Sequence, residues 1–145
     1  MIELNLALLA DNAHMDASGK LYILGEFRYI FAAQLPARHG QFSIVARWEA
    51  SAAEVRGQEN TLELEIVDAD GRAIMPRSPK FPLAFGPIGD AGRGRVEARL
   101  IVGMQGMVLT NYGDHVFQFF VNGIANGTAK FYVASAPAKG LVAGG

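Results

Sequence analysis

Thr61-Leu62-Glu63-Leu64-Glu65-Ile66-Val67-Asp68-Ala69-Asp70-Gly71-Arg72 is the stretch that decides the fold class. Its first seven residues place apolar side chains at every second position, which is the period of a strand with one buried face. The Asp70-Gly71 dipeptide that follows favours a tight hairpin turn, with glycine supplying a positive φ. The stretch therefore predicts a one-sided β-strand that ends in a turn.

The same alternation recurs on both sides of this stretch. Residues 42–49 and 95–102 each predict another strand with one apolar face, and Trp48 is expected to face the core. Residues 21–31 are apolar on both faces, which predicts one long strand that is covered on both sides. Four prolines between residues 73 and 94 restrict any strands there to short or edge positions.

A hairpin is predicted near the C-terminus. The aromatic-rich runs 115–121 and 128–134 are separated by Asn122-Gly123 and Asn126-Gly127, two dipeptides that favour type I′ turns. Either dipeptide can form the tip. Helical spacing is weak and confined to residues 50–58, so at most one helical turn is expected.

Together these patterns predict an all-β domain. Eight to ten short strands with turn signals between them, and no solenoid or propeller repeat, favour a two-sheet antiparallel Greek-key sandwich of the immunoglobulin-like type. A closed barrel is the alternative. One domain is expected over residues 1–134, followed by an Ala/Gly-rich tail at 135–145.

Composition narrows the function. The chain of 145 residues has no cysteine, which excludes disulfides, thiolate nucleophiles and cysteine-ligated metals. The net charge of -1 provides no field for a phosphate backbone, so no nucleic-acid partner is expected. The apolar runs are too short for a membrane helix, and no membrane partner is expected. The N-terminus alternates without a basic region, which favours a strand over a signal peptide and predicts a cytoplasmic protein.

Two segments carry a family resemblance, Asn60–Arg72 and Gly113–Gly123. Together with Ala10–Ala13 and the strand Gly19–Ile30, they resemble a family of small bacterial β-sandwich proteins known only as a domain of unknown function. The resemblance covers residues 5–134. It implies the sandwich fold and no activity. Related immunoglobulin-like sandwiches carry a corner tyrosine where this chain has His115, so that corner is expected to be altered.

The sequence offers few groups for a metal. His14, His39 and His115 are far apart, and no helix presents two of them on one face. Asp11, His14 and Asp16 form the one local cluster of metal-competent residues, and an ordinary polar loop explains it. Asp68 and Asp70 faintly resemble a calcium loop, although turn chemistry already accounts for Asp70. No metal, cofactor or cofactor-binding residue is predicted.

Catalytic patterns are equally sparse. There is no Gly-x-Ser-x-Gly elbow, and alternation places Glu49, Glu63, Glu65 and Glu97 on solvent faces. The Gly-rich segment 86–95 lacks the lysine and the strand-to-helix context of a phosphate loop, so it is interpreted as a surface loop. No catalytic residue is predicted, and the chain is expected not to be an enzyme.

Surplus hydrophobicity is the feature that suggests a function. Alternation places Tyr22, Leu24, Ile30, Phe120 and Tyr132 opposite the expected core residues, together with Val45 and Val116. Large exposed apolar patches mark interaction surfaces. The sequence thus predicts a non-enzymatic interaction or structural module, either a homo-oligomer or one bound to a protein partner. Two alternatives stay open: the Pro-rich segment or the tail covers this face, or loops near Asp11–Ser18 and Gly86–Arg95 bind a small molecule or glycan.

Overall fold

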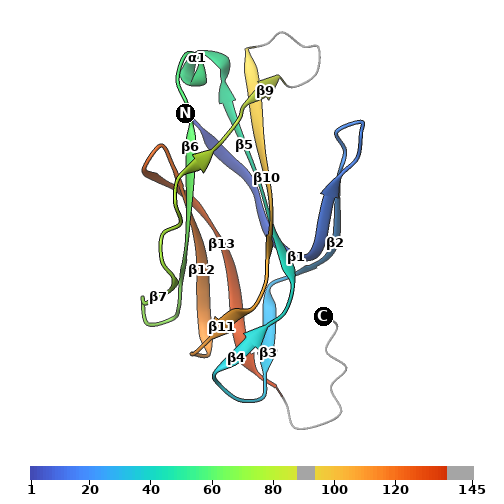
Figure 1. Cartoon of the computed structure of the whole chain (residues 1–145), viewed down its shortest axis with the longest axis vertical. Coiled ribbons are helices and arrows are strands. Elements are labelled where there is room, and N and C mark those ends of the chain that lie inside the picture. Colours follow the sequence, from blue (N-terminus) through green and yellow to red (C-terminus); the bar gives the residue numbers. More distant parts are fainter. Residues whose placement is uncertain (88–93, 137–145) are drawn as a thin grey trace.

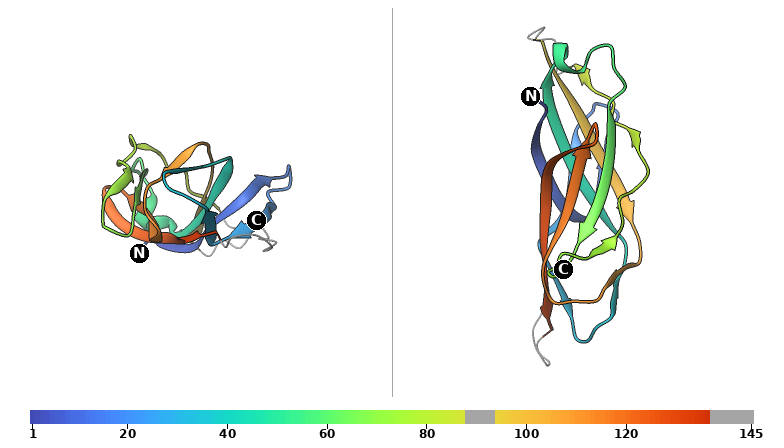
Figure 2. Two further views of the ribbon diagram at one scale, coloured as in Figure 1. Left: turned by 90° about the horizontal axis from the view of Figure 1, so that it is seen from below. Right: turned by 90° about the vertical axis from the view of Figure 1, so that its left-hand side faces the viewer.

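The computed structural model describes residues 1–87 and 94–136. In these residues the chain forms thirteen strands and one helical turn, and the strands build two large sheets that pack face to face and one two-stranded sheet (Figures 1 and 2). The all-β sandwich predicted from the alternating stretches is confirmed. The expected tail begins with Ser135, the last residue of β13, and its residues 137–145 lie outside the described part of the chain.

The two sheets have distinct strand orders. Sheet A has the order β2-β1-β5-β10-β9, with β1 at Glu3–Met15, β2 at Leu21–Phe27, β5 at Phe42–Ser51, β9 at Gly86–Pro87 and β10 at Arg95–Met104. Sheet B has the order β3-β13-β12-β6-β7, with β3 at Tyr29–Ala32, β6 at Thr61–Val67, β7 at Ala73–Met75, β12 at Gly113–Val121 and β13 at Ile124–Ser135. The remaining elements are β4 (Ala37–His39) paired with β11 (Met107–Leu109), β8 (Phe81–Pro82) paired with β6, and the helical turn α1 (Ala52–Val55).

The order matches the immunoglobulin-like pattern. Strands β1, β5 and β10 occupy the places of A, B and E in one sheet, while β6, β12 and β13 occupy those of C, F and G in the other. Along the chain, β5, β6, β10 and β12 alternate between sheet A and sheet B, whereas β12 and β13 form a hairpin within sheet B. All pairings are antiparallel except that of β3 with β13, which is parallel.

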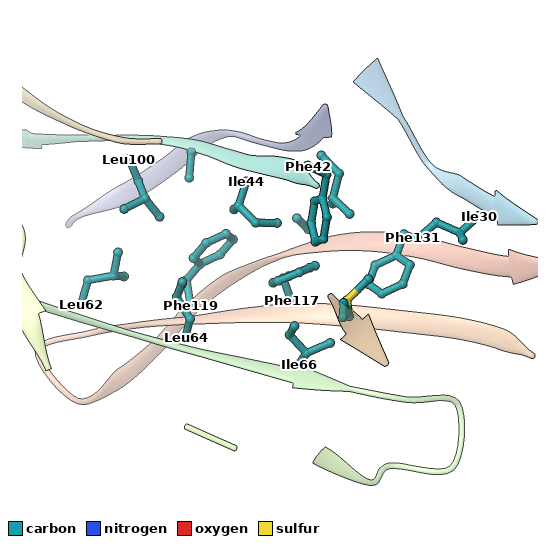
Figure 3. Close-up of a cluster of buried hydrophobic side chains, with 14 of the residues drawn as sticks. Ile30, Phe42, Ile44, Leu62, Leu64, Ile66, Leu100, Phe117, Phe119 and Phe131 are labelled. Carbon is teal, nitrogen blue, oxygen red and sulfur yellow. The ribbon is translucent and has the colours of Figure 1, made fainter. Parts of the chain in front are cut away.

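The core lies between the sheets (Figure 3). Phe42 and Ile44 of β5 face Phe117 and Phe119 of β12, and all four are fully buried. The Trp48 ring packs edge-on against Phe119 with 5.4 Å between centroids, as its predicted core position requires. Its indole N–H donates to Asn126 Oδ1 at 2.9 Å, and this bond links β5 of sheet A to β13 of sheet B.

The predicted turns form, with differences in detail. Gly71 has a φ of 79°, and its N–H donates to the Asp68 carbonyl at 3.0 Å. Asp70 does not share the positive φ, so this is a four-residue turn that ends in a left-handed glycine instead of a type I′ turn. The C-terminal hairpin has its tip at Asn122-Gly123, where both residues have positive φ, and Asn126-Gly127 lies within β13.

The long strand predicted over 21–31 is divided in two. β2 belongs to sheet A and ends at Phe27, whereas β3 begins at Tyr29 and belongs to sheet B. The Arg28 carbonyl accepts from Tyr132 N–H at 2.7 Å, which fixes the point where the chain joins sheet B. Because the strand changes sheets here, the alternation of inward and outward side chains does not continue through Arg28.

The expected irregular and helical segments are also present. In its described residues, the proline-containing stretch forms the short strands β7, β8 and β9. α1 has a capping box in which Ser51 Oγ accepts from Glu54 N–H at 3.3 Å and Glu54 Oε1 accepts from Ser51 N–H at 3.1 Å. Residues 88–93 of the Gly-rich segment lie outside the described residues.

Replacing Gly71 with valine is expected to lower the free energy of unfolding by about 1–2 kcal/mol, because a β-branched residue is strained at positive φ. Gly103→Val is the matched control, since Gly103 lies in β10 without positive φ and a Cβ there meets no atom within 4 Å. Chemical denaturation of both variants measures the difference. Equal midpoints for the two variants would contradict the turn geometry.

Candidate interaction surface

The five side chains predicted to form an outer apolar face divide into two groups. Tyr22, Leu24 and Tyr132 are exposed in the structure. Ile30 and Phe120 are only 6% and 7% exposed, so both predictions of exposure are wrong. Each of the two is buried for a different physical reason.

Ile30 is buried because of the crossing between the sheets. The prediction extended the alternation of β2 through Arg28 and placed Ile30 on the outer side. Since β3 joins the other sheet, Ile30 and Ala32 instead enter the core cluster. The same reversal turns Tyr29 and Phe31 outward, the two residues that the sequence pattern had assigned to the core side.

Phe120 does point away from the core, as alternation with Phe119 and Val121 predicted, but it is covered. The Arg77 guanidinium lies 3.5 Å from the centroid of its ring, a close cation–π contact. Ser78, the next residue, is fixed to β6: its N–H donates to the Leu64 carbonyl at 2.8 Å, and its hydroxyl accepts from Leu64 N–H at 3.0 Å. The Pro-rich segment thus covers this part of sheet B, the alternative that the sequence left open.

The interpretation of Glu63 is also wrong. This side chain was expected on a solvent face, and it is buried beside Phe120, with which it pairs across β6 and β12.

The outer side of sheet A is covered in a similar way. Arg99 of β10 donates to the Gly19 carbonyl and the Met15 sulfur at the end of the β1–β2 hairpin, so the hairpin curls over the outer side of this sheet, where Val45 is buried.

Three aromatic side chains stay uncovered on the outer side of sheet B. They are Tyr29, Phe31 and Tyr132, with exposed fractions of 57%, 39% and 42%, and we call them the aromatic strip. The rings of Tyr29 and Phe31 are nearly parallel, with centroids 6.5 Å apart, and the Tyr132 ring lies 6.2 Å from that of Tyr29. The strip spans β3 and β13, whose residues Tyr29 and Tyr132 are partners in register.

The aromatic strip borders an open strand edge. β3 is the terminal strand of sheet B. The Arg28 carbonyl accepts a hydrogen bond from Tyr132 N–H of β13, and the Ala32 carbonyl accepts one from Ala136 N–H, directly after β13. The backbone groups of the even-numbered residues of this segment therefore face β13. Successive residues of a strand direct their backbone groups to opposite sides. The N–H and C=O groups of Tyr29 and Phe31 therefore face the open edge, where no described strand pairs with them.

The hairpin that carries Tyr22 and Leu24 ends in a closed polar turn. Asp16 Oδ1 accepts from the Ser18 hydroxyl at 2.6 Å and from Lys20 N–H at 3.0 Å, and these bonds lower the pKa of the Asp16 carboxyl to about 2. His14 stacks on Tyr22 with 5.0 Å between ring centroids. The carboxylate of Asp16 and the ring of His14 are thus both engaged within the hairpin.

Asp68 and Asp70 are joined by an amide. Asn111 Nδ2 donates to Asp68 Oδ2 at 2.8 Å and to Asp70 Oδ2 at 3.0 Å. Desolvation raises the pKa of Asp68, but hydrogen bonds from the Arg72 and Asp70 N–H groups and from Asn111 outweigh it and hold this pKa below its ordinary value. Within residues 1–87 and 94–136, no three His, Asp or Glu side chains gather as metal ligands would.

His115 is a structural histidine, as predicted. It is fully buried, Nδ1 lies 2.9 Å from the Gly113 carbonyl, and its ring packs on Phe131 at 5.0 Å. Its Nε2 has no hydrogen-bond partner in the described part of the chain. Because a carbonyl oxygen only accepts, Nδ1–H donates to Gly113, and His115 holds the start of β12 against β13 where other sandwiches use tyrosine.

Comparison with protein-family models identifies the family of the chain. The model of a family of unknown function, DUF6941, matches residues 5–134. The chain belongs to DUF6941. This confirms the resemblance to a domain of unknown function inferred from the sequence, over the same residues. A search of curated proteins finds no match for this DUF6941 chain.

Several chains of solved structures match, and one of them has a partly similar shape. It is the Pseudomonas fluorescens alkylpurine DNA glycosylase AlkC bound to DNA containing an abasic site analog, with a TM-score of 0.46 and 14% sequence identity. The match covers 92% of the DUF6941 chain and 30% of the glycosylase chain, so our chain spans about a third of that protein. A likeness at this level carries no argument about function. No helix in the described ranges is long and apolar enough to cross a membrane.

Stability of the DUF6941 chain is expected to fall as the pH drops below about 6.5. Burial lowers the pKa of His39, whose ring packs 5.2 Å from Phe42 and 5.5 Å from Phe27, and the Asp11 carboxylate opposes this shift only in part. A lowered folded-state pKa means that the unfolded chain binds more protons between the two pKa values. The stability that neutral His39 contributes is therefore fully present above the pKa of the unfolded chain. It is lost as the pH falls toward the pKa of the folded chain.

The test replaces His39 with glutamine and follows the denaturation midpoint from pH 7 to pH 5. The variant should lose the slope that the wild type has in this range, up to about 1.4 kcal/mol per pH unit. Carboxyl groups with lowered pKa values, such as Asp16 and Asp68, act only at more acidic pH. An unchanged slope in His39→Gln would contradict this assignment.

Proposed function

We propose that this DUF6941 chain is a non-enzymatic interaction module that associates with a second copy of itself through the open edge of β3 and the aromatic strip. The observation that carries the proposal is their coincidence. Tyr29 and Phe31 direct exposed rings outward, and their backbone groups face an edge where no strand of the described ranges pairs with them. An open edge with aromatic residues supplies both hydrogen bonds and apolar area to another strand.

The other sheet edges are protected in ways that β3 is not. Edge strands commonly avoid pairing by being very short, by carrying proline or by carrying charge. β7 has three residues and is followed by Pro76, and β9 has two residues including Pro87. The β2 edge carries Glu26 and the positive-φ Gly25. β3, Tyr29–Ala32, has four residues and contains neither charge nor proline, and Arg28 directly precedes it.

Antiparallel pairing of two β3 strands has one favoured register. Residues whose backbone groups face outward must lie opposite each other to exchange hydrogen bonds. Placing Tyr29 opposite the second copy's Phe31 uses the outward groups of both residues in both copies and sets Ile30 on the symmetry axis. The rings of Tyr29 and the second copy's Phe31 then become cross-strand neighbours, which is a stabilising arrangement.

The alternative that a small molecule binds at the loops near Asp11–Ser18 and Gly86–Arg95 receives less support. The first loop has its carboxylate already bonded within the turn. The second lies mostly outside the described residues. The absence of catalytic activity, nucleic-acid partners and membrane partners, and the cytoplasmic location, stay predictions from composition.

Light scattering after size exclusion tests the proposal. The native chain is expected to form a dimer at high micromolar concentration, and Phe31→Lys is expected to be a folded monomer. An aromatic hot spot of this kind contributes about 2 kcal/mol or more, which is roughly a thirtyfold change in affinity. Ile124→Lys is the matched control, because Ile124 is 71% exposed at the hairpin tip away from β3.

Two outcomes would contradict self-association. One is a native chain that stays monomeric at the highest concentration, in which case a different protein would have to occupy the edge. The other is a dimer that Ile124→Lys weakens as much as Phe31→Lys does. Circular dichroism of each variant separates a loss of contact from a loss of fold.

A further inference from the structure

A pocket lies at the end of the sandwich opposite to β3. Its volume is about 690 Å³, within the range of sites for small molecules. One wall is α1 with the residues that follow it, and the other is the segment from Lys80 to Phe85 around β8. In Figure 1, α1 and β9 are at the top of the molecule, and β3 is near the bottom. The pocket and the aromatic strip are therefore separate surfaces.

The walls of the pocket are tied together by hydrogen bonds. Leu83 N–H donates to the Asn60 carbonyl at 2.9 Å, which joins one wall to the other. The Asn60 side chain is buried, and its Oδ1 accepts from Asn122 Nδ2 at 3.0 Å. The capping box of α1 fixes the first wall. A site held in this way needs little reorganisation when a ligand enters.

The interior of the pocket is lined mainly by apolar side chains. Val55, Phe81, Leu83, Phe85 and Val96 supply apolar surface, and all of them are at least partly buried. Polar groups at the base, such as the Asn60 amide, already have partners within the protein. A ligand in this pocket would therefore bury an apolar body without displacing hydrogen bonds of the protein.

Charged side chains line the same pocket. Arg56 and Lys80 are exposed, and neither forms an ion pair with any residue in the described ranges. Glu59 is the one acidic side chain of the lining, so the lining has a net positive charge. Positive charge at the rim of an apolar pocket favours a ligand that has an apolar body and a negatively charged end.

We propose that this pocket binds an amphipathic organic anion, with an aromatic body against Phe81 and Phe85 and a carboxylate at Arg56 and Lys80. The aromatic rings of the lining favour a planar body, since aromatic rings pack with one another in offset or edge-on arrangements. The Arg56 guanidinium offers the carboxylate a planar fork of N–H donors, and the Lys80 ammonium acts as a point charge. This site is independent of the proposed self-association.

The test uses 2-naphthoate as the probe and NMR of the methyl groups of Val55, Leu83 and Val96 as the readout. Naphthoate is expected to shift these signals in a saturable way and to bind about tenfold more tightly than 2-naphthylmethanol or 2-naphthylmethylammonium. The double variant Arg56→Ala/Lys80→Ala should lose about this tenfold preference. Lys130→Ala, a cation beside a smaller pocket of about 350 Å³, is the matched control and should keep it.

A second variant tests the place of binding. Ala84 lines the pocket and is exposed, so Ala84→Trp should fill part of the space without disturbing the core and abolish the shifts. The same variant should leave the oligomeric state unchanged, which keeps this proposal distinguishable from the proposed function. Failure of naphthoate to shift these methyl groups at millimolar concentration, or equal binding by the wild type and either pocket variant, would overturn the proposal.

Discussion

The passage of the chain from sheet A to sheet B at Arg28 is the constraint on which the rest of the structure depends. Hydrogen bonds to the Arg28 carbonyl from Tyr132 N–H and to the Ala32 carbonyl from Ala136 N–H hold β3 in register on β13. That register places Ile30 in the core beside Phe131 (Figure 3). It also directs the rings of Tyr29 and Phe31 outward. The buried side of the sandwich and its exposed aromatic strip are thus two consequences of a single crossing.

Apolar side chains on the outer sides of both sheets are covered by other segments of the chain. On sheet B, Arg77 covers Phe120, and Ser78 holds this segment against β6. On sheet A, the β1–β2 hairpin reaches Arg99 and covers the side on which Val45 lies. Both covers come from segments that connect the long strands, the first between β6 and β10 and the second between β1 and β5. The aromatic strip lies beyond either cover, which is why it stands out as the candidate surface.

Sequence reasoning succeeded where local physics decides the outcome. The alternation in 61–67, the turn at Gly71 and the C-terminal hairpin all depend on residues within a few positions of each other, although the sequence left the hairpin tip open between Asn122-Gly123 and Asn126-Gly127. It failed at Ile30 because periodicity does not reveal that a strand changes sheets, although the charged residues Glu26 and Arg28 interrupt the apolar run there. It failed at Phe120 because the covering Arg77 is distant in sequence. The pocket beside α1 was missed because its lining is assembled from several separate segments.

Residue-resolved hydrogen exchange of the β3 amides tests the central claim most directly, because the open edge makes the exchange of alternate residues depend on concentration. The amide of Ile30 faces β13 and should be protected at low and at high protein concentration. The amides of Tyr29 and Phe31 should exchange freely in the dilute protein and become protected as the concentration rises. Protection of Tyr29 and Phe31 already in the dilute monomer, or free exchange of both at every concentration, would contradict the account.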